Sequence, residues 1–269
     1  MKNSSTIIIF FIIMISLLTP DISFSDDPKA REIMQKVEDR DDGDNRTHTT
    51  IMVLTDKNGD ERRKEFKNFM KDFGKDTKQI MFIEKPSNAR NTGFLTFDFN
   101  DPGKDDDQWL YLPAIGKAKR IASNEKDSSF MGSDLNYSDM TGRNLSDYYY
   151  KILKEVTLKG ADVWLIESTP VSQKVIDETG YKKSILAVRK DNYVVTKRKA
   201  WTRDGGYVKI FDFDKLQVVN GIWVTREVKI IKRLGKTVQH STYVYTNDIK
   251  FNQNLPEEMF TTLRLIKGL

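Results

Sequence analysis

The chain is 269 residues long, carries a formal net charge of +5 and contains no cysteine. The missing thiol excludes a disulfide framework, a cysteine nucleophile and lipid attachment to a cysteine behind a cleaved signal. Lys and Arg alternate with Asp and Glu along most of the chain, which is typical of a solvated sheet face. A nucleic-acid surface collects basic residues without acids, so the pattern argues against that class of partner.

The N-terminal segment has the pattern of a secretory signal. Lys2 precedes the apolar run Ile7 to Leu18, and the small residues Ser23 and Ser25 follow it. We predict cleavage after Ser25 and export of residues 26–269. The alternative is an uncleaved anchor, but a spanning helix needs about twenty apolar residues. The exported part contains no Pro/Ser-rich linker and no clear repeat, which favours one domain over residues 26–269.

The first predicted element is a short amphipathic helix. Apolar residues recur at helical spacing in Pro28 to Glu38, and the acidic turn Asp39 to Asn45 follows. This turn resembles a calcium-binding loop, but the spacing fails. With Gly43 as the sixth position, the third would be Arg40 and the twelfth Thr49, where calcium needs oxygen ligands and a bidentate glutamate. We therefore expect no metal site.

Beyond Arg46 the chain has the pattern of successive strands. Turn signals such as Asn58-Gly59 and Asn220-Gly221 separate alternating β-forming segments. Residues 145–155 fit a helix or a strand, and residues 172–179 and 256–265 fit helical turns. The predicted strands are residues 47–55, 61–73, 78–84, 93–99, 109–112, 162–168, 183–190, 194–202, 206–213, 222–232 and 237–251. The expected fold class is mainly β (α+β), with an antiparallel sheet that buries one face.

The stretch from Asp107 to Met140 differs from these strands. A short aromatic strand contains Trp109 and Tyr111, and Pro113 ends it. A basic turn with Lys117, Lys119 and Arg120 follows. The next segment is rich in Ser and Gly but contains three large apolar residues, namely Phe130, Met131 and Leu135. These side chains either form a small core beneath a long loop or line an apolar cleft.

This stretch also resembles a known family. The WLYLP strand, the KxKRI corner and the SFMGSDLNYSDM segment resemble the LolA-like outer-membrane lipoprotein-sorting proteins, and in particular an uncharacterised branch of them. The resemblance extends from AREIMQKVEDRDDGDNRT to NLPEEMFTTLRL. It implies a large, curved antiparallel sheet that forms an unclosed barrel. Short helices and loops would cover its concave apolar face, which would receive acyl chains, and the protein would act in the periplasm.

Catalytic signatures are missing from the sequence. The two histidines, His48 and His240, fall inside predicted strands without a nucleophile elbow or a metal-ligand spacing. No Gly-rich phosphate loop and no dinucleotide fingerprint is present. Acidic residues are too common for any pair to stand out as an acid–base couple. We therefore expect a protein that is not an enzyme and needs no cofactor.

Together with the missing catalytic signatures, the resemblance implies a non-catalytic, monomeric carrier or acceptor that binds lipoprotein or lipid acyl chains and moves them toward the outer membrane. The expected cleft or lid residues are Trp109, Tyr111, Phe130, Met131 and Leu135. The cations Lys117, Lys119 and Arg120 would dock on an inner-membrane transporter or, transiently, on a membrane surface. The alternative is a sensor or adaptor subunit that uses the same sheet to bind a membrane transporter or a signalling protein.

Overall fold

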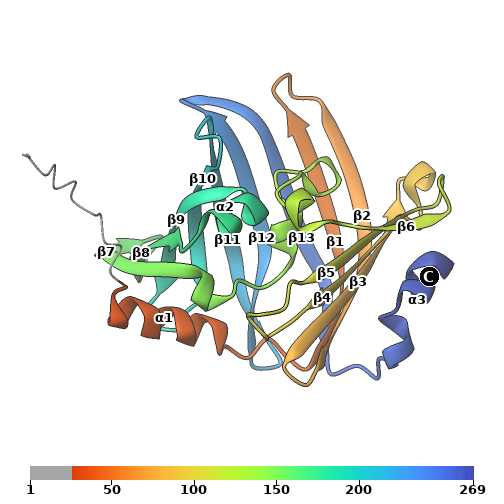
Figure 1. Cartoon of the computed structure of the whole chain (residues 1–269), viewed down its shortest axis with the longest axis horizontal. Coiled ribbons are helices and arrows are strands. Elements are labelled where there is room, and N and C mark those ends of the chain that lie inside the picture. Colours follow the sequence, from red (N-terminus) through yellow and green to blue (C-terminus); the bar gives the residue numbers. More distant parts are fainter. Residues whose placement is uncertain (1–25) are drawn as a thin grey trace, which may run out of the picture.

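The computed structural model describes residues 26–269, so the expected signal and its cleavage site after Ser25 lie outside the described part. All the strands of this part belong to one antiparallel sheet (Figure 1). Its thirteen strands are β1 (Asn45–Asp56), β2 (Glu61–Phe73), β3 (Asp76–Lys85), β4 (Gly93–Asp98), β5 (Asp107–Leu112), β6 (Lys117–Arg120), β7 (Tyr148–Leu158), β8 (Ala161–Pro170), β9 (Tyr181–Arg189), β10 (Val195–Thr202), β11 (Tyr207–Val219), β12 (Ile222–Leu234) and β13 (Thr237–Phe251).

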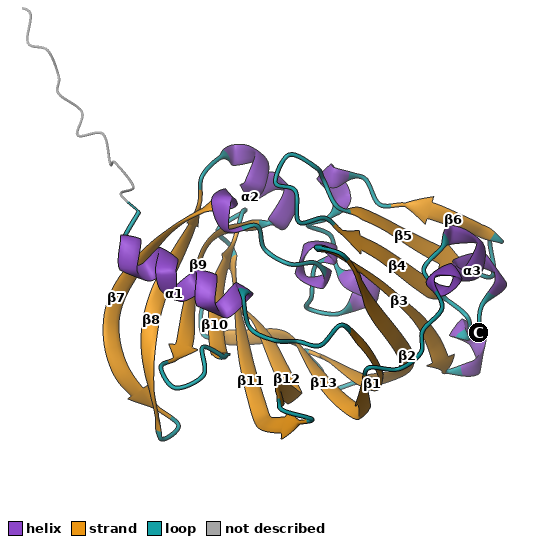
Figure 2. Ribbon diagram, turned by 90° about the horizontal axis from the view of Figure 1, so that it is seen from below, coloured by secondary structure: helices purple, strands orange, loops and turns teal. Residues whose placement is uncertain are grey.

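The order of the strands explains why one connection must be long. The sheet runs β6-β5-β4-β3-β2-β1-β13-β12-β11-β10-β9-β8-β7, so β6 and β7 are its two edges although they are consecutive in the chain. Every other sequential pair of strands is hydrogen-bonded directly. The connection between β6 and β7, residues 121–147, therefore has to travel across the whole sheet, and we call it the crossing loop. Figure 2 shows it inside the curve of the sheet, which confirms the expected unclosed barrel.

The two faces of the sheet carry separate cores because successive strand residues point to opposite sides. In β3, Met81 and Ile83 join a cluster beneath the crossing loop, whereas Ile80 and Phe82 join a cluster on the other face. We call the face beneath the loop the concave face and the opposite one the convex face. The convex cluster is covered by the C-terminal segment, which includes the buried Leu265. Large apolar side chains are therefore buried on both sides of β2 to β4.

Three short α-helices complete the fold, namely α1 (Pro28–Glu38), α2 (Gln173–Thr179) and α3 (Thr262–Lys267). Helix α1 has the predicted limits because Asp27 caps it, accepting hydrogen bonds from the backbone N–H of Lys29 and Ala30, and because Pro28 lacks an N–H that would need a partner. Asp26 accepts a hydrogen bond from the Tyr150 N–H at 2.8 Å, which ties the helix start to β7. Helix α1 thereby covers the concave face near β7 to β9.

Two local predictions need correction or completion. The basic residues Lys117 to Arg120 were expected in a turn, but they form the edge strand β6, and the turn lies just before them at residues 113–116. The pairing of Tyr111 with Ala118 holds them in the sheet, which local sequence could not reveal. The ambiguous segment 145–155 is a short 3-10 turn, Leu145–Asp147, followed by strand β7.

Candidate functional site

The crossing loop and the concave face beneath it form the candidate site. The loop contains four short 3-10 turns, Ser123–Glu125, Phe130–Gly132, Tyr137–Met140 and Leu145–Asp147. Such turns satisfy backbone groups only locally, so the remaining polar groups need partners elsewhere. Its first half covers an apolar part of the sheet, and its second half covers a polar part.

Phe130 is the apolar anchor of the first half. Its side chain is fully buried, and its ring meets the ring of Phe94 edge-on at 5.1 Å between centroids. Tyr137 of the same loop packs against both rings, at 5.7 and 5.6 Å. Inward residues of β1 and β2 surround this trio, among them Leu54 and Phe66. The loop therefore fills the apolar part of the concave face with its own aromatic side chains.

The backbone at the tip of the loop is strained. Met131 has φ +49°, a left-handed conformation that costs a residue with a side chain on the order of 1 kcal/mol or more. Its carbonyl oxygen accepts a hydrogen bond from Lys64 Nζ at 2.5 Å. Burial lowers the pKa of that lysine, with a further contribution from the positive charge of Arg62. The hydrogen bond from Lys64 thus helps to hold Met131 in a backbone conformation that is unfavourable for a residue with a side chain.

Asp134 attaches the same loop to strand β13. Its carboxylate accepts a hydrogen bond from Thr242 Oγ1 at 2.8 Å and lies 2.7 Å from His240 Nδ1. Its backbone N–H donates to Thr242 Oγ1 at 2.9 Å. Asp134 and Thr242 are both buried. The carboxylate sits between the histidine and the hydroxyl, so the histidine cannot activate that hydroxyl as in a catalytic triad. We call this set the Asp134 anchor.

A buried polar network holds the second half of the loop. Asp139 forms an ion pair with Arg198 at 2.8 Å and accepts a hydrogen bond from the Tyr181 hydroxyl at 2.7 Å. Lys209 Nζ donates to Asn136 Oδ1 at 2.7 Å. Burial raises the pKa of Asp139, but the charges of Arg198 and Lys209 outweigh it, so the net shift is downward. Burial lowers the pKa of Lys209 to about 8.

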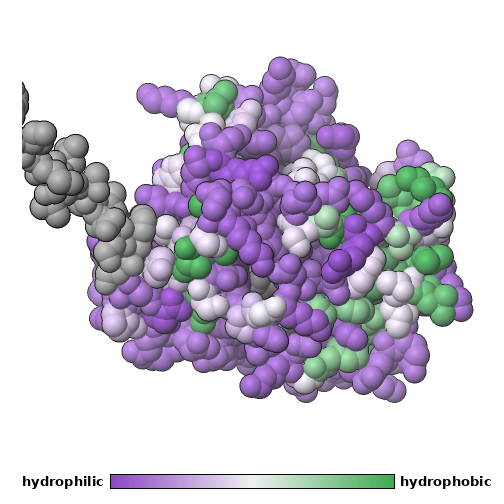
Figure 3. Space-filling view, in the orientation of Figure 1, coloured by the Kyte–Doolittle hydropathy of each residue, from purple (hydrophilic) through white to green (hydrophobic). Residues whose placement is uncertain are grey.

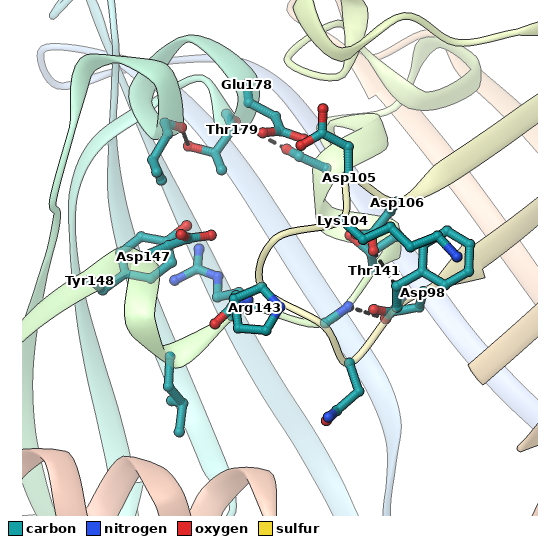
Figure 4. Close-up of a pocket in the computed structure, with 18 of the residues that line it drawn as sticks. Asp98, Lys104, Asp105, Asp106, Thr141, Arg143, Asp147, Tyr148, Glu178 and Thr179 are labelled. Atoms are coloured by element: carbon teal, nitrogen blue, oxygen red, sulfur yellow. Dashed lines mark hydrogen bonds between the residues drawn. The ribbon is translucent and has the colours of Figure 1, made fainter. Parts of the chain in front are cut away.

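A polar cavity of about 430 Å³ lies between the second half of the loop and the segments around α1 and α2 (Figure 4). Lys126 is almost fully buried at its wall and pairs with Glu178 at 2.7 Å. Burial raises the pKa of Asp98 to about 6, and the neighbouring charge of Asp106 adds to this. Arg143 also lines the cavity, with its guanidinium 5.3 Å from the Tyr148 ring centroid. Charged and polar side chains dominate this cavity, in contrast to the apolar region beneath Phe130.

The structure brings some of the predicted cleft residues together and separates others. Phe130, Met131 and Leu135 pack with the concave cluster beneath the loop. Trp109 and Tyr111 point to the convex face, where they pack with the cluster around α3. The five residues therefore do not all line the same cleft: three lie on the concave face and two on the convex face. The reason is strand parity: on β5 the concave position belongs to Leu110, the residue between the two aromatics.

The three predicted docking cations differ in whether they form an ion pair. Lys119 pairs with Glu125 at 2.8 Å, and Arg120 pairs with Asp107. Lys117 is exposed and has no ion pair within the described residues. Two of the three charges therefore already face a carboxylate, although such exposed pairs contribute little to stability.

Sequence reasoning missed the polar anchors of the loop. Arg198 and Lys209 occupy inward positions of their strands, where the neighbouring inward residues Ala200 and Phe211 are apolar. A charged residue at an apolar position of an alternating strand is the signal that could have identified them. His240 was expected as a structural or surface strand residue, and it lies in β13 beside Asp134.

A model of a family described as uncharacterized protein-like matches residues 75–267, more than half of the chain. A solved structure titled as a putative outer-membrane lipoprotein-sorting protein domain, from Vibrio parahaemolyticus, is 27% identical. It matches with a TM-score of 0.79 over 88% of this chain and 98% of that one. The chain belongs to the family of this model and is LolA-like in its fold. A search of curated proteins found no match.

Two further structures share the fold of this LolA-like protein. A DUF1329 family protein from Desulfovibrio piger is 24% identical, with a TM-score of 0.81 over 88% of this chain and 98% of that one. A LolA superfamily protein from Nitrosomonas europaea is 18% identical, with a TM-score of 0.64 over 86% and 97%. Within residues 26–269, no helix has the length and apolar character needed to cross a bilayer.

Proposed function

We propose that this LolA-like protein is a non-catalytic periplasmic carrier or acceptor that binds the acyl chains of a lipoprotein or lipid on its concave face and moves them toward the outer membrane. The crossing loop would be the lid of this site, and residues 26–269 would act as one domain after cleavage behind Ser25. The observation that carries the proposal is the insertion of Phe130 into the apolar part of the concave face. Similarity to the structure titled as a putative outer-membrane lipoprotein-sorting protein domain supports the same function.

The energetics of the loop are compatible with opening. Burial of Phe130 and the polar anchors stabilise the closed loop, whereas the left-handed Met131 backbone destabilises it. An acyl chain that takes the place of the Phe130 ring recovers the apolar contacts that opening loses. The loop and the ligand therefore compete for the same surface, and the closed loop lowers the apparent affinity by the fraction of open molecules.

The test is a titration of the protein with a fluorescent fatty-acyl probe. Replacing Phe130 with alanine weakens the closed state, so we expect tighter probe binding, by tenfold or more if fewer than about a tenth of the molecules are open. Phe260→Ala is the matched control, because Phe260 is equally buried but packs against Phe73 on the convex face. Its probe affinity should stay unchanged.

Equal affinities in the wild type and both variants, or no probe binding by any of them, would contradict the lid. Mass spectrometry of an organic extract from protein purified from the periplasm gives the second readout. Bound acyl chains support the carrier, whereas a stoichiometric protein complex without acyl chains supports the adaptor alternative.

A further inference from the structure

Four large apolar side chains are exposed at one end of the molecule. Ile115, in the turn between β5 and β6, is 64% exposed, and Leu263 of α3 is 60% exposed. Ile266 and Leu269 in the same C-terminal segment are 44% and 50% exposed. Figure 3 shows hydrophobic residues gathered at this end, over α3 and the neighbouring turn. We call these four residues the end patch.

The geometry of α3 produces this exposure. Leu265 is fully buried against the convex face, and the α3 segment contacts β4, β5 and β6. Residues in a helix are rotated by about 100° from one to the next, so anchoring Leu265 turns Leu263 to the opposite side and Ile266 to the flank. The helix therefore buries one apolar face on the sheet and leaves a second one in solvent. The end patch lies on the convex side, so it is separate from the acyl site proposed above.

Cations without ion-pair partners flank the end patch. Lys117 follows the turn of Ile115, and Arg264 and Lys267 belong to α3. Arg90 is exposed, and the side chain of its neighbour Asn91 lies beside Gly268. None of these four cations has an ion pair within the described residues 26–269. Three carboxylates of the neighbouring elements pair with other cations: Asp107 with Arg120, Glu125 with Lys119 and Glu257 with Lys71.

We propose that the end patch and these cations dock the protein on the surface of an anionic phospholipid bilayer. Exposed apolar side chains surrounded by unpaired cations combine the two contributions that interfacial membrane binding needs, namely apolar insertion and attraction to anionic headgroups. A second copy of the chain is the less suitable occupant, because the same cations would then face one another across a symmetric interface. Docking needs no bound acyl chain, so it can fail while the carrier function holds.

Sedimentation with lipid vesicles tests this proposal. The full exported chain should bind vesicles of phosphatidylcholine and phosphatidylglycerol at a ratio of three to one, and binding should weaken in high salt and on pure phosphatidylcholine. Each basic residue near an anionic surface strengthens binding by roughly fivefold, from about 1 kcal/mol per charge. The double variant Lys117→Gln/Lys267→Gln should therefore bind about 25-fold more weakly. The control Lys57→Gln/Lys236→Gln removes two exposed charges elsewhere and should bind like the wild type.

An apolar series tests the second contribution. Ile115→Ser/Leu263→Ser/Ile266→Ser should lose most of the binding while keeping its melting temperature, since all three side chains are exposed. Leu153→Ser/Val218→Ser/Leu234→Ser, with 42%, 47% and 49% exposure on other strands, is the control. The proposal is wrong if the wild type does not bind anionic vesicles, or if each control loses as much binding as its test variant. It is also wrong if light scattering shows a dimer that only the end-patch variants disrupt.

Discussion

Removing the Asp134 carboxylate should release the crossing loop without unfolding the sheet. Asp134→Ala deletes the contacts of this carboxylate to Thr242 and His240. Each hydrogen bond to a charged group contributes about 1.5 kcal/mol or somewhat more, so two contribute about 3 kcal/mol to the closed loop. This corresponds to a roughly hundredfold larger population of the open loop. Native-state hydrogen exchange measures that population directly.

The readout is the exchange of loop amides compared with sheet amides. The Phe130 N–H donates to the Leu135 carbonyl at 2.7 Å, and the Ser133 N–H donates to the Phe130 carbonyl at 2.9 Å. We expect both amides to exchange about a hundredfold faster in Asp134→Ala, while amides of β8 and β9 keep their protection. Thr242→Val keeps the carboxylate but removes both its hydroxyl donor and the acceptor of the Asp134 N–H, so it should accelerate the same amides. Unchanged loop protection would refute the anchoring role, and equal acceleration in β8 and β9 would show that the variant unfolds globally.

Three further predictions concern the packing and charges around the loop. Burial raises the pKa of Asp98 to about 6, so between pH 4 and 6 the folded state holds a proton that the unfolded state has lost. The free energy of unfolding contributed by this group therefore falls as the pH rises through this window. Asp98→Asn should flatten that fall, measured by denaturant titrations at pH 4.5 and pH 7. Gly93→Ala should destabilise by about 1–3 kcal/mol because a Cβ there would lie 2.6 Å from Leu265 Cδ1, and the added Leu265→Ala substitution should remove this clash in a double-mutant cycle. Arg198→Met should cost about 3 kcal/mol or more in the denaturation midpoint because it leaves the Asp139 carboxylate buried without its cation, whereas an unchanged midpoint would contradict the importance of that pair.

Local signals in the sequence predicted most of the strands and the first helix. Helix α1 begins and ends as expected because its cap, its proline and its apolar stripe are all local features of Asp27 to Glu38. The edge strand β6 was missed for the opposite reason. Its four residues are polar or small, and their extended conformation depends on pairing with β5. A strand defined by its neighbour leaves little trace in its own residues.

The candidate site was less predictable because its geometry depends on long-range contacts. Alternation along β5 shows that Trp109 and Tyr111 share a face, but it does not say which face is concave. That choice is set by the strand order and by the packing of α3, about 150 residues further along the chain. The Asp134 anchor likewise joins a loop residue to Thr242, 108 positions away. Neither feature has a local pattern.

The strand order itself links the fold to the proposed lid. Because β6 and β7 are the two edges of the sheet, one segment has to cross from one edge to the other, and the concave face is the side that the crossing loop takes. A loop tied to the sheet at both ends can move away from that face without breaking any strand pairing. Packing of Phe130 holds its apolar half on the sheet. The Asp139–Arg198 ion pair and the hydrogen bond from Lys209 to Asn136 hold its polar half. Opening of the apolar half alone would expose the surface proposed for acyl chains, while the buried ion pair keeps the rest of the loop in place.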